Sequence, residues 1–302
     1  SLRSSSSSNR CISVRSLLDH ACDRQVFGDA EGARRWRAAA GAIAGAEPHL
    51  GRVWHLRVYD TGLAVLDGSF AEAERGSDEI ARIGRRIKHP YARGVERALR
   101  AFPARERGDD AEVLRIFDPT RPIRIGPVQF VQAVVGRALC TLGRRAEAEA
   151  VFEDLLGAGA AGIPRNIRWH ATIAEASLLT AELGDETRAE ELLALLEPVA
   201  SQHAVLSLVT YGGPFARCLA RLEETLGRPD RAADRYEEAE EAAAALGARP
   251  MRTRILLEQG QLLARRGDRR GARERLVEAA RTAEALGMAG VAQAARNSTA
   301  AL

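Results

Sequence analysis

Lysine is almost absent from this 302-residue chain, because Lys88 is its only lysine and the other basic residues are arginine. A phosphate-binding P-loop needs a lysine after its glycines to reach the phosphates. The segment Arg85-Arg86-Ile87-Lys88-His89-Pro90 has neither a glycine loop nor a following serine or threonine, which excludes a nucleotide hydrolase of that type. Richness in alanine, arginine and glycine with so little lysine is typical of a high-GC bacterial genome.

Paired cysteines, long apolar runs and aromatic side chains are also scarce. The four cysteines show no CxxC spacing, so free thiols in a reducing cytosol are expected, and with them a cytoplasmic location; they are Cys11, Cys22, Cys140 and Cys218. No apolar run approaches the roughly 18–20 residues of a membrane span, so no membrane partner is expected. Aromatics make up only 5% of the chain, which favours tightly packed helices over a sheet protein.

Patterns that would indicate catalysis are absent as well. The six histidines include no HExxH or other short metal-ligand spacing, and no GxSxG nucleophile elbow occurs. Acidic pairs such as Glu223-Glu224 and Glu240-Glu241 lie near arginines, a pattern typical of solvated helix faces with ion pairs rather than acid–base catalysts. We therefore expect no catalytic residue, no metal and no cofactor, and a chain that is not an enzyme.

Glycine, in contrast, recurs with a regular period. Seven glycines are spaced 35 to 43 residues apart, most of them close to 40: Gly28, Gly68, Gly108, Gly143, Gly184, Gly227 and Gly267. A small apolar residue follows each one five positions later: Ala33, Ala73, Val113, Ala148, Ala189, Ala232 and Ala272. A period of about 40 with a turn glycine flanked by small residues is the signature of a helical repeat array.

Each repeat is interpreted as a helix, a glycine turn, a second helix and a short proline-bearing joint. In the last two units, residues 5, 9 and 12 positions after the glycine share one helix face; they are Ala232, Tyr236 and Ala239, then Ala272, Leu276 and Ala279. The sequence predicts an all-α, right-handed α-α superhelix of about seven helix-turn-helix repeats, each packing only on its neighbours. Residues 1–10 are expected to form a disordered serine-rich tail, residues 11–287 the solenoid, and residues 288–302 a C-terminal cap helix and tail.

Prolines predict irregularity in the middle of the chain. Pro103 should kink or shorten the first helix of the third unit. The stretch from Pro119 to Pro127 contains three prolines, so the second helix of that unit is expected to end early. Gly212-Gly213-Pro214 should break another helix.

These residues resemble tetratricopeptide repeats, most specifically in the last two units. The units exceed the usual 34 residues and resemble the longer MalT-like variety. The stretches Leu246-Gly247-Ala248-Arg249-Pro250, Leu262 to Asp268 and Ala285-Leu286-Gly287-Met288 are similar to the helical region of actinobacterial LuxR-type or nucleotidyl cyclase-associated ATPase regulators. The resemblance implies that the repeats act as a sensor or scaffold, although no other part of such a regulator is present.

In tetratricopeptide arrays the first helix of each unit lines the concave surface. Offsets from the glycines place five residues at inward positions there: Arg137, Arg217, Arg221, Arg254 and Gln261. His55 and Phe102 fall at such positions earlier in the chain. The C-terminal half of the groove would then be basic and suited to an acidic peptide or carboxylate, so these five residues are the candidate partner-binding site.

Three functions remain open on this sequence. The first is a non-catalytic protein–protein interaction or scaffold module of a bacterial regulatory protein, with a protein or acidic peptide partner. The second is a sensor region of a multidomain ATPase, nucleotidyl cyclase or LuxR-type transcriptional regulator; the chain begins with serine rather than methionine, which fits a segment of a longer protein. The third, a nucleic-acid-binding array, draws on six arginines between Arg265 and Arg275, but the net charge is only +3 and acidic residues interleave them, so a solvated face is the better interpretation.

Overall fold

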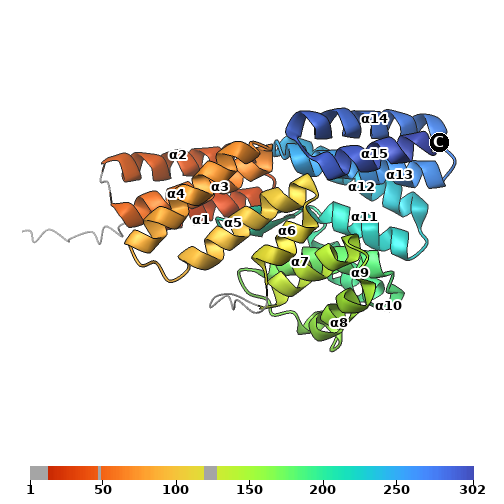
Figure 1. Ribbon diagram of the computed structural model, residues 1–302, viewed down its shortest axis with the longest axis horizontal. Helices are drawn as coiled ribbons and strands as arrows, with labels where there is room; N and C mark the ends of the chain where they lie inside the picture. Colours follow the sequence, from red (N-terminus) through yellow and green to blue (C-terminus); the bar gives the residue numbers. More distant parts are fainter. Residues whose placement is uncertain (1–12, 47–48, 119–127) are drawn as a thin grey trace, which may run out of the picture.

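The computed structural model describes residues 13–46, 49–118 and 128–302. The predicted tail over residues 1–10, the joint at Pro48 and the stretch from Pro119 to Pro127 lie outside these described residues. Within them the chain is an all-α array of consecutive helices that pack as pairs, with one short β-hairpin (Figure 1). The prediction of an all-α class is therefore confirmed.

The described elements follow one another along the chain in hairpin fashion. The α-helices are α1 (Val14–Val26), α2 (Ala30–Ala46), α3 (Leu50–Asp67), α4 (Phe70–Arg86), α5 (Ala92–Arg107), α6 (Asp110–Ile116), α7 (Val128–Thr141), α8 (Arg145–Leu156), α9 (Trp169–Leu183), α10 (Glu186–Leu196), α11 (Phe215–Thr225), α12 (Pro229–Ala245), α13 (Arg249–Arg265), α14 (Arg269–Leu286) and α15 (Ala289–Ala300). Short 3₁₀ turns cover Ala160–Gly162 and Glu197–Val199, and the strands are β1 (His203–Leu206) and β2 (Thr210–Pro214).

All seven periodic glycines lie at bends between consecutive helices and have a positive φ. Gly68, for example, has a φ of 88° and donates its backbone N–H to carbonyl groups at the end of α3. A side chain is disfavoured in this left-handed region, so glycine ends the helix and lets the chain turn. The prediction that these glycines form the hairpin bends is confirmed.

The small-residue faces of the last two units pack as the sequence indicates. Ala232, Tyr236 and Ala239 are fully buried, and so are Ala272, Leu276 and Ala279. Alanine lets the backbones approach closely, while the larger residue at the middle position fills the space between helices.

The prolines have mixed effects. Pro103 lies inside α5, which nevertheless continues to Arg107, so the predicted shortening is wrong. A proline removes only one backbone hydrogen bond, and Pro103 is buried in the helix packing. The predicted early end of the next helix is confirmed, since α6 has only seven residues.

The β-hairpin was not predicted by the sequence, although the break at Gly212-Gly213-Pro214 is confirmed because α11 begins directly afterwards. The strands β1 and β2 are antiparallel, with a bulge between Ala204 and Val205. Both strands are almost wholly buried and contact α1, α3, α9 and α12. The hairpin thus occupies the interior of the helical array, near the centre of Figure 1.

Gly62 marks the closest approach between the hairpin and α3. A Cβ atom added at Gly62 would lie 2.8 Å from the Val209 carbonyl oxygen. Alanine in a helix is otherwise favoured over glycine by about 1 kcal/mol. We expect Gly62→Ala to lower the free energy of unfolding by about 1–3 kcal/mol, because the added atom forces the backbones apart.

Gly45→Ala in α2 is the matched control for this substitution, since a Cβ there meets no atom within 4 Å. It should leave stability unchanged or raise it slightly. Urea denaturation of both variants measures the difference, and a stabilised Gly62→Ala protein would show that the hairpin does not lie against α3.

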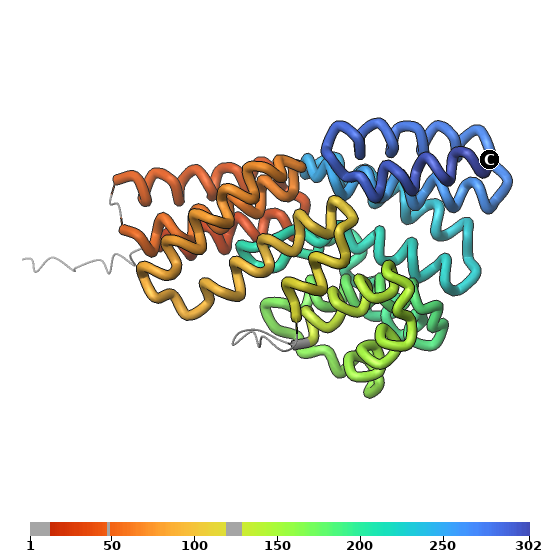
Figure 2. The backbone as a smooth tube through the Cα atoms, viewed as in Figure 1, coloured from red at the N-terminus to blue at the C-terminus, as the bar shows by residue number. Residues whose placement is uncertain are grey.

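The C-terminal helices also pack back on the N-terminal half of the chain. Helix α13 contacts α3, and α15 contacts α5; the backbones of Gly108 and Gly290 approach so closely that a Cβ on Gly108 would lie 3.0 Å from the Gly290 Cα. Figure 2 shows the C-terminal helices beside the ends of the N-terminal ones. The expectation that each unit packs only on its neighbours is therefore wrong. Contacts between units far apart in sequence close the array on itself.

Candidate functional site

The five residues predicted to line a groove come from three helices, and only some of them meet. Arg137 lies on α7, Arg217 and Arg221 on α11, and Arg254 and Gln261 on α13. Arg137, Arg217 and Arg254 line one cavity, whereas Arg221 and Gln261 do not. The Gln261 amide donates instead to the Ser298 hydroxyl, 3.1 Å away on α15.

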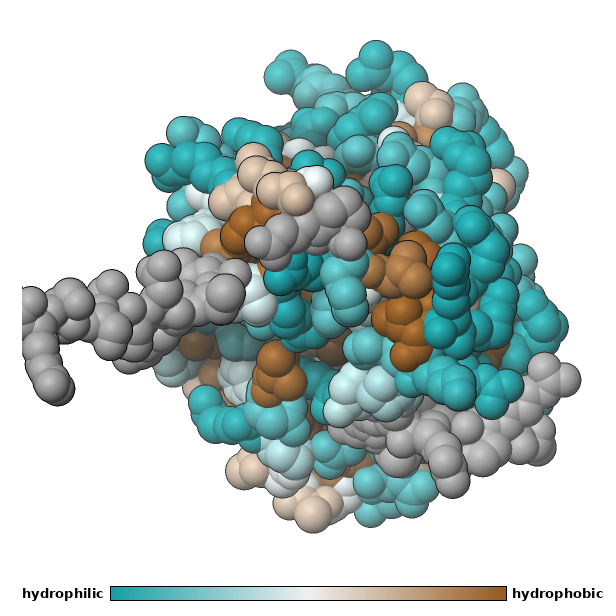
Figure 3. Space-filling model, turned by 90° about the vertical axis from the view of Figure 1, so that its left-hand side faces the viewer, coloured by the Kyte–Doolittle hydropathy of each residue, from teal (hydrophilic) through white to brown (hydrophobic). Residues whose placement is uncertain are grey.

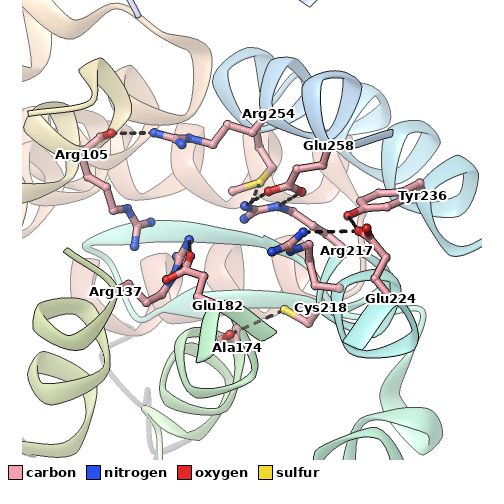
Figure 4. Close-up of polar contacts among 12 residues, drawn as sticks. Arg105, Arg137, Ala174, Glu182, Arg217, Cys218, Glu224, Tyr236, Arg254 and Glu258 are labelled. Carbon is pink, nitrogen blue, oxygen red and sulfur yellow. Dashed lines mark hydrogen bonds and ion pairs between the residues drawn. The ribbon is translucent and has the colours of Figure 1, made fainter. Parts of the chain in front are cut away.

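Each of these three arginines is bound to a carboxylate of the same chain. We call the group around them the interior arginine cluster; it consists of Arg105, Arg137, Arg217 and Arg254 with Glu106, Glu175, Glu182 and Glu258. Figure 4 shows most of these side chains converging from separate helices. The predicted basic groove is thus neutralised in large part by glutamates.

Glu175, on α9, is the centre of one half of the cluster. Its two carboxylate oxygens accept hydrogen bonds from Arg105, at 2.5 Å, and from Arg137, at 2.8 Å. The Glu175 side chain is only 3% exposed. Burial alone would raise its pKa, but the two guanidinium groups outweigh this effect and lower the pKa to about 2. Glu175 therefore stays charged and holds α5, α7 and α9 together.

Arg217 and Glu258 form the other half. Two nitrogens of the Arg217 guanidinium donate to the two Glu258 oxygens at 2.9 and 2.7 Å. This bidentate geometry is the strongest that arginine and a carboxylate make. Against the opposing effect of burial, it lowers the Glu258 pKa to about 2. Arg217 is 4% exposed, so its charge is committed to this pair.

A third pair joins α5 to α13. Arg254 donates to the Glu106 carboxylate at 2.7 Å and to the Arg105 carbonyl oxygen at 2.6 Å. Glu106 is buried, which alone would raise its pKa, yet Arg254 and Arg105 hold that pKa below its usual value. This pair spans 148 residues of sequence.

The cavity between these pairs has a volume of about 220 Å³. Its lining is Arg105, Glu106, Gly108, Asp110, Arg137, Thr141, Arg217, Met251, Arg254, Leu257, Gly290, Val291 and Ala294. Arg105, Glu106 and Asp110 were not predicted from the sequence, because they belong to the third unit and only the closure of the array brings them to α13. No periodic pattern carries that information.

A second, more apolar cavity of about 310 Å³ opens among α1, α3, α5, α7 and the hairpin tip. It is lined by Trp54, which stacks on His89 with ring centroids 4.0 Å apart, and by residues that include Val95, Phe130 and Leu208. On the end of the molecule seen in Figure 3, hydrophobic residues lie in separate patches among hydrophilic ones. Trp54 itself is only 2% exposed.

The thiols of Cys140 and Cys218 and the imidazole of His203 have pKa values that keep them neutral near pH 7. Burial raises the pKa of Cys140 to about 11 and that of Cys218 to about 12. Burial also lowers the pKa of His203 to about 4, and its Nδ1 lies 2.8 Å from the Tyr211 hydroxyl. Thiols that stay protonated are poor nucleophiles. Among the described residues no group of three or more His, Cys, Asp or Glu side chains is placed to hold a metal ion.

The arginines between Arg265 and Arg275 lie on an ion-paired surface. Four of the six contact a carboxylate of this chain: Arg265 with Glu224, Arg266 with Asp230, Arg270 with Glu274 and Arg275 with Glu240. Such pairing lowers the positive charge available to a phosphate backbone, which favours the interpretation as a solvated face.

Searches with the sequence match no protein-family model and no curated protein. In the part of the chain that the structure describes, no helix is both long enough and apolar enough to cross a membrane.

Proposed function

We propose that this chain is a non-catalytic binding module of a bacterial regulatory protein, a right-handed superhelix of about seven tetratricopeptide-like, MalT-like repeats that holds a protein partner. The observation that carries the proposal is the array of helix pairs bent at seven left-handed glycines. Arrays of this kind present long continuous helix faces, which suit recognition of another chain.

The charge distribution inside the array supports binding rather than turnover. The carboxylates of the interior arginine cluster are tied to guanidinium groups, and the lowered pKa values of Glu175 and Glu258 leave them unable to donate or accept a proton near neutral pH. The cluster therefore contributes to structure and recognition, not to acid–base chemistry.

The partner-binding role of Arg137, Arg217, Arg221, Arg254 and Gln261 stays a prediction. An acidic peptide would have to compete with Glu258 for Arg217 and with Glu106 for Arg254. Charge reversal at Arg217 would disturb a buried pair as well as any partner contact. Arg221, whose side chain is 25% exposed and pairs with Glu224 at 3.4 Å, is the better position at which to test the groove.

The experiment is affinity purification with the folded, tagged chain as bait, compared with the same chain after heat unfolding. A retained protein is then purified, remixed with the bait, and followed by size-exclusion chromatography with light scattering. We expect a complex of fixed stoichiometry that Arg221→Glu weakens at least about tenfold while the bait stays folded. If no protein distinguishes the folded from the unfolded bait, the proposal is wrong.

The two cavities favour a second candidate function, the sensor region of a multidomain ATPase, nucleotidyl cyclase or LuxR-type regulator. The cavity of about 310 Å³ is at the lower end of the range for small-ligand sites, and the cavity of about 220 Å³ lies below that range. The coding sequence upstream of Ser1 separates the candidates: a P-loop there supports the sensor function, and an in-frame start codon argues against it.

A further inference from the structure

Asp110 is a buried carboxylic acid that lines the 220 Å³ cavity and makes no hydrogen bond or ion pair through its side chain to any residue that the structure describes. Asp110 is 9% exposed. Glu106, Glu175 and Glu258 all bind arginines directly, whereas Asp110 does not. A carboxylate on a cavity wall that no neighbouring arginine binds is free to accept hydrogen bonds from a ligand in that cavity.

Among the described carboxyl groups that line this cavity, Asp110 is the one that no arginine binds directly. Burial raises the pKa of Asp110 and, together with Glu182, outweighs the nearby Arg254, Arg137 and Arg105, which act to lower that pKa. The guanidinium groups are held by their own glutamates and do not reach Asp110. The carboxyl therefore faces a space in which a hydrogen-bond donor could be accommodated.

Part of the arginine donor capacity is also unused. Arg254 donates hydrogen bonds through Nε and Nη2, so its Nη1 has no described partner. Arg105 donates to Glu175 through Nη1, so its Nε has no described hydrogen-bond partner. A guanidinium has five N–H donors in a fixed fork, so a paired arginine can still bind a second carboxylate. The remaining wall is apolar and comes from α13 and α15, through Leu257, Val291 and Ala294.

We propose that this cavity binds a free α-amino acid with a small apolar side chain. Its ammonium group would bind Asp110, its carboxylate would bind Arg254 and Arg105, and its side chain would lie against Leu257, Val291 and Ala294. A carboxylate without the ammonium group would leave Asp110 unpaired beside a second negative charge. An amine without the carboxylate would place a positive charge among arginines. A zwitterion satisfies both sides and adds no net charge.

This interior site goes beyond the proposed function, since it needs no protein partner. Its test is calorimetric titration of the purified chain with L-alanine, L-valine and L-leucine. We expect saturable binding of at least one of them. For the best ligand, the analogue without the ammonium group (4-methylpentanoate for leucine) and the analogue without the carboxylate (3-methylbutylamine) should each bind at least about tenfold more weakly.

Two substitutions tie the binding to Asp110. Asp110→Asn should weaken binding of the amino acid at least about tenfold without lowering the thermal midpoint, because the Asp110 side chain makes no ion pair or hydrogen bond with a described residue that asparagine would lose. Asp109→Asn is the matched control: Asp109 is exposed and caps α6 through the Glu112 backbone N–H at 3.0 Å, and asparagine caps equally well. Ala294→Leu, which fills the cavity from its apolar side, should also abolish binding and gives a second test if Asp110→Asn does not fold.

Three results would overturn the inference. The first is that none of the three amino acids binds. The second is that 4-methylpentanoate or 3-methylbutylamine binds as tightly as L-leucine, which would mean that a single charge is recognised. The third is that a folded Asp110→Asn or Ala294→Leu protein binds with unchanged affinity. None of these results bears on the affinity-purification experiment, so the two proposals fail separately.

Discussion

Replacing Arg217 with methionine is expected to lower the free energy of unfolding by about 3–5 kcal/mol, because it leaves Glu258 buried without its partner. Arg217 is 4% exposed and donates two hydrogen bonds to Glu258. Its Nη1 also lies 3.6 Å from the Met251 sulfur. Methionine restores much of the side-chain volume, so the loss measured by urea or thermal unfolding reports the charge pair rather than a cavity.

Arg270→Met provides the matched control. Arg270 is 92% exposed, and its nearest carboxylate contact, with Glu274, is 3.6 Å long. Exposed pairs of this kind contribute at most about 1 kcal/mol. Replacing both members of the buried pair, Arg217→Met with Glu258→Leu, should recover much of the lost stability, since no unpaired charge remains. A change below about 1 kcal/mol for Arg217→Met alone would show that the pair is exposed to solvent.

The local architecture was accessible from the sequence because it depends on short-range rules. A glycine at a left-handed bend and small residues on the following helix face, such as Gly267 with Ala272 and Ala279, act within one hairpin. The same rules placed the break before α11 and the short helix α6. These short-range rules describe each helix pair and its packing on the adjacent pair.

The long-range architecture was not accessible in this way. The offsets selected Arg217 and Arg254, which line the same cavity, but nothing in the period shows that Glu258 and Glu106 would neutralise them. The hairpin was missed because its apolar residues also suit a buried helix, and because the tip depends on Ser207 adopting a φ of 47°. A left-handed serine is not signalled by composition. Its hydroxyl accepts a hydrogen bond from Arg15, 192 residues away.

The closure of the array on itself is the feature on which both the internal cavity and the buried cluster depend. It is represented most clearly by the pair Glu106 and Arg254, which joins α5 to α13. Glu106 is 6% exposed, so Glu106→Gln should lower the free energy of unfolding by about 3–5 kcal/mol by leaving Arg254 without its carboxylate. Arg254→Met should have a similar effect through Glu106.

A double-mutant cycle with Glu106→Gln and Arg254→Met tests this closure directly, by urea unfolding of the wild type, both single variants and the double variant. The control cycle combines Glu106→Gln with Arg270→Met, two residues that form no pair, and its effects should add within about 0.5 kcal/mol. We predict an interaction energy of about 1–3 kcal/mol between Glu106 and Arg254. Additive effects within about 0.5 kcal/mol would mean that the C-terminal helices do not pack on the N-terminal half, and would contradict the closed array.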